Sequence, residues 1–117
     1  MLEPRLQSYL DTIQECLSLI QHRLSGIHSA EDLIRNDAGM LIMDGIAIRL
    51  QLIGETVKKL DHHYPGFFAS KGIDPKPIIR FRDFVAHHYD EVDYELLYDI
   101  CINHLPALRE KLDALLS

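Results

Sequence analysis

A short run near the middle of the second half of the chain gathers the side chains best suited to chemistry on a phosphate. Residues 80–89 read Arg-Phe-Arg-Asp-Phe-Val-Ala-His-His-Tyr, which combines guanidinium groups, imidazoles and a phenol. An arginine stays charged and can stabilise negative charge on phosphoryl oxygens, whereas a histidine can accept or donate a proton near neutral pH. Arg82, His87 and Tyr89 are therefore the candidate reactive residues, and the chemistry they favour is metal-independent cleavage of a phosphodiester.

The spacing of these residues has a consequence for assembly. Arg82 and Tyr89 are seven residues apart and share one face of a helix, but His87 lies about 140° around the helix from Arg82. A single straight helix does not point Arg82 and His87 at one phosphate. Two copies of the chain that meet at a two-fold axis can pool the two groups, so the spacing favours a homodimer.

Other reaction centres find little support in the sequence. No Glu-x-x-His or His-x-x-x-His motif occurs, and no phosphate-binding loop, dinucleotide fingerprint or nucleophile elbow is present. His87 and Glu91 have the spacing to share a metal ion, which leaves that alternative open but weak. Cys16 and Cys101 lie in apolar helical patterns without basic neighbours, as is typical of two buried thiols. We therefore expect no metal site and no cofactor.

The elements that position these residues are expected to be helices. Apolar residues recur at helical spacing, and no segment alternates with period two for long enough to form a strand. The fold class predicted is all-α, an up-and-down four- to five-helix bundle that forms one domain over residues 1–117. The expected helices begin near Pro4, at the cap Ser29, at the cap Asp37 (running to about Asp61), at Asp74-Pro75, and after a cap region at 90–93, with a kink or break at Pro106.

Glycines interrupt the longest of these helices. Gly39, Gly45 and Gly54 each lower helix propensity by about 1 kcal/mol relative to alanine. A missing Cβ also lets another backbone approach closely, so we expect a contact with another helix or another subunit on this segment.

Charge is distributed unevenly along the chain. The whole sequence has a net charge of −6, which argues against a non-specific nucleic-acid binder and gives no reason to expect DNA binding. The stretch from Lys58 to Tyr89, in contrast, is net +3 and contains four of the seven histidines. This local excess favours one anionic ligand on an otherwise acidic protein, and charges scattered over a solvated surface would give the same pattern in sequence.

The cellular location is expected to be the cytoplasm. The first residues, Met1 to Arg5, lack a basic region followed by an apolar run, so no secretion signal is expected. No uncharged stretch approaches the roughly 20 apolar residues of a spanning helix, so no membrane association is expected either.

The pattern Arg82-x-x-x-x-His87-x-Tyr89 resembles that of the HepT-like ribonuclease toxins of the HEPN superfamily. The acidic turn that follows, the Leu105-Pro106 pair in the last helix, and the Ile46-to-Leu60 helix with its Gly54-Glu55 pair support the same likeness. The resemblance covers essentially the whole chain. One residue departs from it, because the family usually has Asn after the motif arginine and this chain has Asp83, which can hold Arg82 in a local ion pair.

The resemblance implies a function and a partner. Arg82 and His87 match the pair assigned to RNA cleavage across a homodimer cleft, with a ribose 2′-hydroxyl as nucleophile and no metal ion. Tyr89 matches the tyrosine that a MntA-type minimal nucleotidyltransferase antitoxin modifies with AMP. A bulky, negatively charged group there would exclude an anionic substrate by volume and by repulsion. Arg80 and His88 are the further candidates for contacts with RNA.

A second function stays open at this point. A helical subunit that binds a nucleotide or a substrate for a minimal nucleotidyltransferase, without catalysis of its own, shares the same general architecture. The intact Arg-His-Tyr set favours the enzyme. Each of the three residues also has a purely structural alternative. Arg82 can be a surface cation paired with Asp83, His87 a hydrogen-bonded histidine, and Tyr89 an aromatic residue at the edge of the core.

Overall fold

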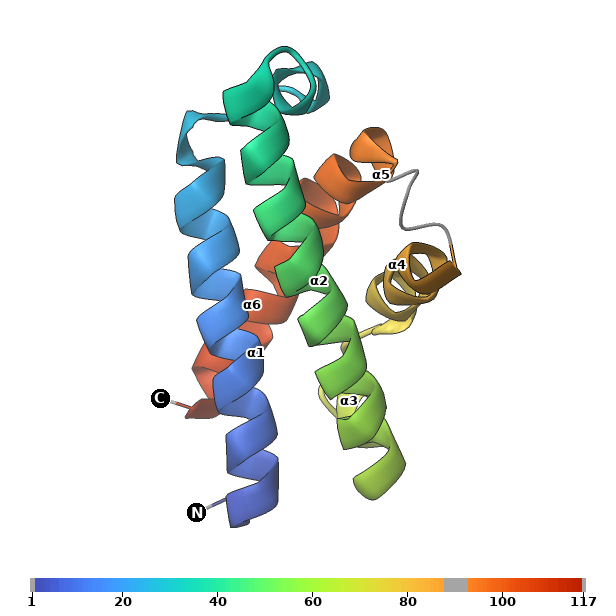
Figure 1. Ribbon diagram of the computed structural model, residues 1–117. Coiled ribbons are helices and arrows are strands. Elements are labelled where there is room, and N and C mark those ends of the chain that lie inside the picture. Colours follow the sequence, from blue (N-terminus) through green and yellow to red (C-terminus); the bar gives the residue numbers. More distant parts are fainter. Residues whose placement is uncertain (1, 88–92, 117) are drawn as a thin grey trace.

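Two long antiparallel helices and a third, broken helical rod form the frame of the molecule in this computed structural model (Figure 1). The structure describes residues 2–87 and 93–116, and for residues 84–87 it describes the backbone alone. The described chain contains no strand, which confirms the all-α prediction. The elements are α1 (Pro4–Arg23), η1 (Leu24–Gly26), η2 (Ala30–Leu33), α2 (Asp37–His63), α3 (Phe67–Ser70), α4 (Lys76–His87), α5 (Tyr94–Asp99), η3 (Ile100–His104) and α6 (Leu105–Leu116).

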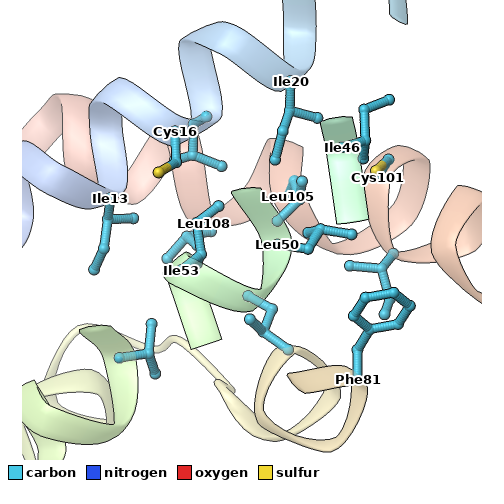
Figure 2. Close-up of a cluster of buried hydrophobic side chains, with 14 of the residues drawn as sticks. Ile13, Cys16, Ile20, Ile46, Leu50, Ile53, Phe81, Cys101, Leu105 and Leu108 are labelled. Carbon is cyan, nitrogen blue, oxygen red and sulfur yellow. The ribbon is translucent and has the colours of Figure 1, made fainter. Parts of the chain in front are cut away.

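The core lies where α1, α2 and the C-terminal helical segment formed by α5, η3 and α6 meet. Figure 2 shows side chains from α1, α2, α4 and the η3–α6 segment pointing into one cluster. Burial of such side chains from water is the main force that holds the helices together. Helix α4 contributes Ile78 and Phe81 to this core, both of them buried, and these two residues fix one face of the helix that carries the candidate site. Helix α2 packs on α1 along one side and on α4 along another, so it links the core to the site.

The start of α2 differs by one residue from the prediction. The cap is Asn36 rather than Asp37, because the Asn36 side-chain oxygen accepts a hydrogen bond from the Gly39 backbone N–H at 2.8 Å. Asp37 becomes the first helical residue, where its negative charge is favourable at the positive end of the helix dipole. The short segment that follows Ser29 is a 3₁₀ turn, shorter than the helix expected there.

The connection from α2 to α4 folds back on the core. Gly66 adopts a left-handed conformation with φ of 82°, and the turn it makes allows Phe68 to become buried. Asp74 then accepts a hydrogen bond from the Lys76 backbone N–H at 3.0 Å, as expected for a cap at the start of α4. Helix α4 therefore has a defined beginning at Lys76.

The break expected near Pro106 takes the form of a π-helical turn. Asp93 caps α5 by accepting hydrogen bonds from the backbone N–H groups of Glu95 and Leu96, as predicted for the 90–93 region. The helix widens over Ile100–His104 and returns to α-helical geometry at Leu105. Pro106 has no N–H to donate to the carbonyl four residues earlier, and its ring crowds the preceding turn, so a local widening is the physical response.

The described residues contain no helix long and apolar enough to cross a membrane.

Candidate functional site

Arg82 lies at the seam between α4 and α2. Its side chain passes directly over Gly54, where a Cβ would come within 2.5 Å of the Arg82 Cβ and 3.0 Å of its Cγ. The Ile78 carbonyl oxygen is also only 3.3 Å from that position. Only a glycine at residue 54 therefore allows α4 to sit this close to α2 with Arg82 at the contact. This confirms the expected close approach of another helix on the glycine-bearing segment, and the approaching helix is the one that carries the candidate site.

The guanidinium of Arg82 is held at the edge of the protein. Its side chain is 28% exposed, and Nη1 donates a hydrogen bond to Asp83 Oδ1 at 2.9 Å. This is the local ion pair expected from the Arg82-Asp83 sequence. The Asp83 side chain is 46% exposed, and a pair so accessible to water contributes about 0–1 kcal/mol to stability. The pair therefore orients the guanidinium without locking it.

One hydrogen-bond donor of the Arg82 side chain has no acceptor among the described residues. Its Nε is buried and has no hydrogen-bond partner among the described residues. A buried polar group without a partner is uncommon and costs about 1–3 kcal/mol, so Arg82 keeps one donor that no described residue uses.

A second cation reaches the same carboxylate from the other helix. Lys58 follows Gly54 by one turn on α2, and its Nζ lies 4.0 Å from Asp83 Oδ1. We did not single out Lys58 from the sequence, where it is one of six cations in the basic stretch. The i, i+4 spacing of Gly54 and Lys58 was the available signal, because it puts the close-contact residue and the cation on one face.

The remaining candidate residues are placed to different extents. Arg80 is exposed on α4, about 200° around the helix from Arg82, so the two arginines point to opposite sides. His87 is the last residue of α4, and its side chain is outside the described part of the structure. His88 and Tyr89 also lie outside the described residues. The structure thus positions Arg82 and does not bring Arg80 to it.

The thiols are not reactive groups at neutral pH. Both cysteines are buried and free, and Figure 2 shows their sulfur atoms within the core cluster. Burial raises the pKa of Cys101 to about 12, and burial also raises the pKa of Cys16 against the opposing effect of Arg49. A thiol needs to be a thiolate to act as a nucleophile, so neither residue supplies one.

Metal ligands do not gather in the described part of the chain. No group of three or more His, Cys, Asp or Glu side chains is arranged there to hold a metal ion. His104 Nε2 approaches Asp99 Oδ2 at 3.7 Å, but this pair has no third partner of that kind.

A cavity lies elsewhere on the described part of the chain. It has a volume of about 550 Å³ and lies between α1 and the η3–α6 segment, with an apolar floor and one charged end. The charged end consists of Arg109, Glu110 and Asp113. Of the candidate residues whose side chains the structure describes, Arg80 and Arg82, neither lines this cavity.

Comparison with known proteins identifies the family. The model of the ribonuclease HepT-like family matches residues 13–115. Over 93% of this chain, the sequence is 32% identical to the protein named "Putative RNase TTE0752" of Caldanaerobacter subterraneus subsp. tengcongensis, of which it covers 92%. A second relative, "Putative RNase MJ0127" of Methanocaldococcus jannaschii, is 37% identical over 49% of this chain and 46% of its own length. No solved structure matches. The chain belongs to the HepT-like ribonuclease family, as the resemblance at Arg82, His87 and Tyr89 had suggested.

Proposed function

We propose that this protein is a metal-independent endoribonuclease that acts as the toxin of a toxin–antitoxin pair in the cytoplasm. The observation that carries the proposal is the position of Arg82 in a chain of the HepT-like ribonuclease family. The Cβ and Cγ atoms of Arg82 pack against Gly54, and its guanidinium group stays at the surface. A charged group fixed at its base and accessible at its tip is suited to a long, anionic substrate such as RNA.

In the proposed reaction, His87 takes the proton of a ribose 2′-hydroxyl. The resulting oxygen attacks the adjacent phosphorus, and the bond to the 5′-oxygen of the next nucleotide breaks. That oxygen takes up a proton from water, His87 later releases its own proton to solvent, and the products are a 2′,3′-cyclic phosphate and a 5′-hydroxyl. Arg82 stabilises the charge that builds on the phosphoryl oxygens in the transition state. No step needs a metal ion, so cleavage is expected to survive EDTA.

The proposed active unit is a homodimer. His87 follows Arg82 by five residues on α4, which separates the two Cα–Cβ directions by about 140°. We propose that Arg82 of one copy and His87 of the other serve the same phosphate. Arg80, on the exposed side of α4, and His88 are candidates for contacts with more distant parts of the RNA.

Mixing two inactive variants tests this arrangement. Arg82→Ala and His87→Ala are each expected to lose about 10²-fold or more in cleavage rate. When equal amounts are unfolded together and refolded, half of the dimers are mixed and each mixed dimer contains one intact site, so about a quarter of wild-type activity should return. Recovery of no activity, with mixed dimers present by mass spectrometry, would contradict a site shared between two chains.

Control by the partner is proposed to act through Tyr89. An antitoxin of the minimal nucleotidyltransferase class would transfer AMP from ATP: the Tyr89 phenol oxygen attacks the α-phosphorus, pyrophosphate leaves and the phenolic proton is released. The added nucleotide carries negative charge close to the residues that bind the RNA phosphate, and it would compete with the substrate for them.

The tyrosine variant separates cleavage from its control. Tyr89→Phe should cleave RNA about as well as the wild type and should escape inactivation by partner and ATP. Mass spectrometry that finds AMP on Tyr94 or Tyr98, with Tyr89 unmodified and cleavage still silenced, would contradict the assignment.

The alternative of a non-catalytic nucleotide- or substrate-binding subunit has one observation in its favour. Asp83 already engages Arg82 Nη1, and an arginine so occupied offers less to a phosphate. A purified wild-type dimer that binds RNA but leaves it intact under all conditions would support this alternative over the nuclease.

A further inference from the structure

The Asp83 carboxylate lies between cations from two different helices. Its Oδ1 atom accepts the hydrogen bond from Arg82 Nη1 at 2.9 Å and lies 4.0 Å from Lys58 Nζ. Arg82 comes from α4 and Lys58 from α2, and Gly54 on the same face of α2 makes their approach possible. Two cations therefore converge on one negatively charged oxygen at the surface of the protein.

We propose that Lys58 is a second phosphate-binding residue of the RNA site, and that Asp83 competes with an RNA phosphate for the position between Lys58 and Arg82. This inference rests on the proposed ribonuclease function and deepens it. A non-bridging phosphate oxygen has the charge and the acceptor geometry of the carboxylate oxygen now found between the two cations. Arg82, Lys58 and Asp83 together carry one positive charge, which matches one phosphodiester.

A purely structural role explains the position of Lys58 less well. The Lys58 side chain is 58% exposed and its distance to Asp83 is at the outer limit of an ion pair, so this contact does little to hold α2 and α4 together. The buried Ile78 and Phe81 and the close contact at Gly54 already do so. The Lys58 charge instead adds to the positive potential beside Arg82, where an anionic ligand benefits from it.

The acids on α2 leave that charge available. Glu55 and Asp61 are near Lys58 in sequence, but among the described residues only Asp83 lies within 4.0 Å of its ammonium group. Asp83 is itself 46% exposed, so a phosphate can reach its pair with Arg82 from solvent. Lys58 can then bind that phosphate with an ammonium group that presents three donors on a flexible stem.

The role expected for Lys58 is to position RNA and not to take part in the bond-breaking step. The contact from Lys58 to the phosphate that it shares with Arg82 is expected to be equally strong in bound RNA and in the transition state, and such uniform binding lowers KM without raising kcat. A contact to a phosphate also reads no base sequence. Removal of the Lys58 charge should therefore raise KM and weaken RNA binding, with little change in kcat. The loss should be the same for RNAs of different sequence.

Binding of an uncleavable RNA tests the inference. The probe is a fluorescent single-stranded oligonucleotide with 2′-O-methyl riboses, because the missing hydroxyl removes the proposed nucleophile. Fluorescence anisotropy between 50 and 200 mM salt gives the affinity and its salt dependence. The variants are Lys58→Met, the charge-retaining Lys58→Arg, and the matched control Lys59→Met, which removes the next lysine on a different face of α2.

The expected result is specific to Lys58. Lys58→Met should bind about 5- to 10-fold more weakly, and the slope of log affinity against log salt should fall in magnitude by about 0.7, the value for one lost phosphate contact to a single strand. Lys58→Arg should restore the slope, and Lys59→Met should behave as the wild type. Thermal melts of all three variants should match, because both lysines are exposed.

Two outcomes separate the failure of this inference from the failure of the proposed function. If the wild type cleaves RNA and Lys58→Met binds the probe with wild-type affinity and slope, the role of Lys58 is overturned and the nuclease stands. If binding depends on Lys58 as expected but the wild type cleaves no RNA, the phosphate site stands and the nuclease is overturned.

Discussion

Two arginines in this molecule are alike in their exposure and in their pairing with an aspartate, but they differ in the charges around that pair. Arg82 on α4 is 28% exposed and Arg109 on α6 is 31% exposed, and each is paired with an aspartate of its own helix. Each also has one buried guanidinium nitrogen without a partner among the described residues, Nε in Arg82 and Nη1 in Arg109. Half-burial, an aspartate and an orphan donor are thus common to both.

The difference lies in what surrounds each pair. The aspartate paired with Arg82 also has the cation Lys58 at 4.0 Å, whereas Arg109 shares the lining of its cavity with Glu110 and Asp113. Asp113 is also held by Gln14 of α1, whose amide donates to it at 2.8 Å, so that cluster ties α6 to α1. The charges around each pair, and not the exposure of the arginine, therefore distinguish the proposed phosphate site from a structural ion pair.

The largest difference is expected when each arginine is removed. Arg82→Ala should lower the rate of RNA cleavage by about 10²-fold or more, because it removes the group proposed to stabilise the phosphoryl charge. Arg109→Ala should leave the rate within about 3-fold, since its surroundings are acidic and repel RNA. Single-turnover cleavage of a labelled RNA measures both. Equal losses in two folded variants would break the distinction between the two arginines.

Substitution of Gly54, against which Arg82 packs, should give the next largest effect on cleavage. Gly54→Ala places a Cβ where it collides with the Arg82 stem and the α4 backbone, and such overpacking costs about 1–3 kcal/mol. The displaced guanidinium should lower cleavage by about 10-fold, because small misplacements of a reacting group are costly.

A second glycine of the same helix provides the control. A Cβ at Gly45 meets only the flexible end of Arg23, at 3.4 Å, so Gly45→Ala should retain activity and gain up to about 1 kcal/mol from helix propensity. Denaturant melts and cleavage rates of the two variants test this pair. A Gly54→Ala protein as stable and as active as Gly45→Ala would contradict the claim that Gly54 is needed to position Arg82.

The two aspartates should respond in opposite ways. Asp83→Asn removes the competing carboxylate beside two cations, so RNA affinity should rise by about 3-fold at moderate salt. Asp113→Asn removes a charge far from the candidate site and should leave RNA affinity unchanged, with a small loss of stability from its contacts to Arg109 and Gln14. Anisotropy titrations at one salt concentration compare them. Weaker binding by Asp83→Asn would indicate that the carboxylate assists the site.

The smallest effect is expected for the reactivity of Cys101, which lines the cavity between α1 and the η3–α6 segment. Burial raises its pKa from the ordinary value of 9.0 to about 12. The thiol should therefore stay protonated and resist iodoacetamide at pH 8 in the folded protein, and its reactivity should rise only as the pH approaches 12 or when the protein unfolds. Mass spectrometry after brief alkylation measures the adduct. Rapid native labelling would show that the cavity opens.

The helices could be predicted from the sequence because their signals are local. The apolar stripes of α1 and α2, the Asp74 and Asp93 caps and the proline-induced break all depend on residues within one or two turns. The residue that caps α2 was predicted wrongly because Asn36 and Asp37 are both good capping residues. The choice between them depends on where Gly39 meets the Asp32 backbone, which is a tertiary contact.

The candidate site could be predicted only in part for the same reason. Arg82 was identified by its type and by its motif, and the Asp83 pair by adjacency. The position of Lys58 beside Asp83 depends on how α2 crosses α4, and that crossing is set by Gly54 and by the buried face of α4. Residue spacing along one helix does not contain this information. The relation of Arg82 to His87 and Tyr89 stays a prediction from sequence.

The most direct test of the distinction between the two arginines is to observe both guanidinium groups while RNA binds. In protein labelled with ¹⁵N-arginine, the Nε–H signals of Arg82 and Arg109 can be assigned with the two alanine variants and followed during titration with the 2′-O-methyl oligonucleotide. We expect the Arg82 signal to shift as its buried Nε environment changes, with a titration curve that matches RNA binding, while the Arg109 signal stays in place. Saturation with RNA that moves the Arg109 signal and leaves Arg82 unchanged would contradict the assignment of the α2–α4 seam as the RNA site.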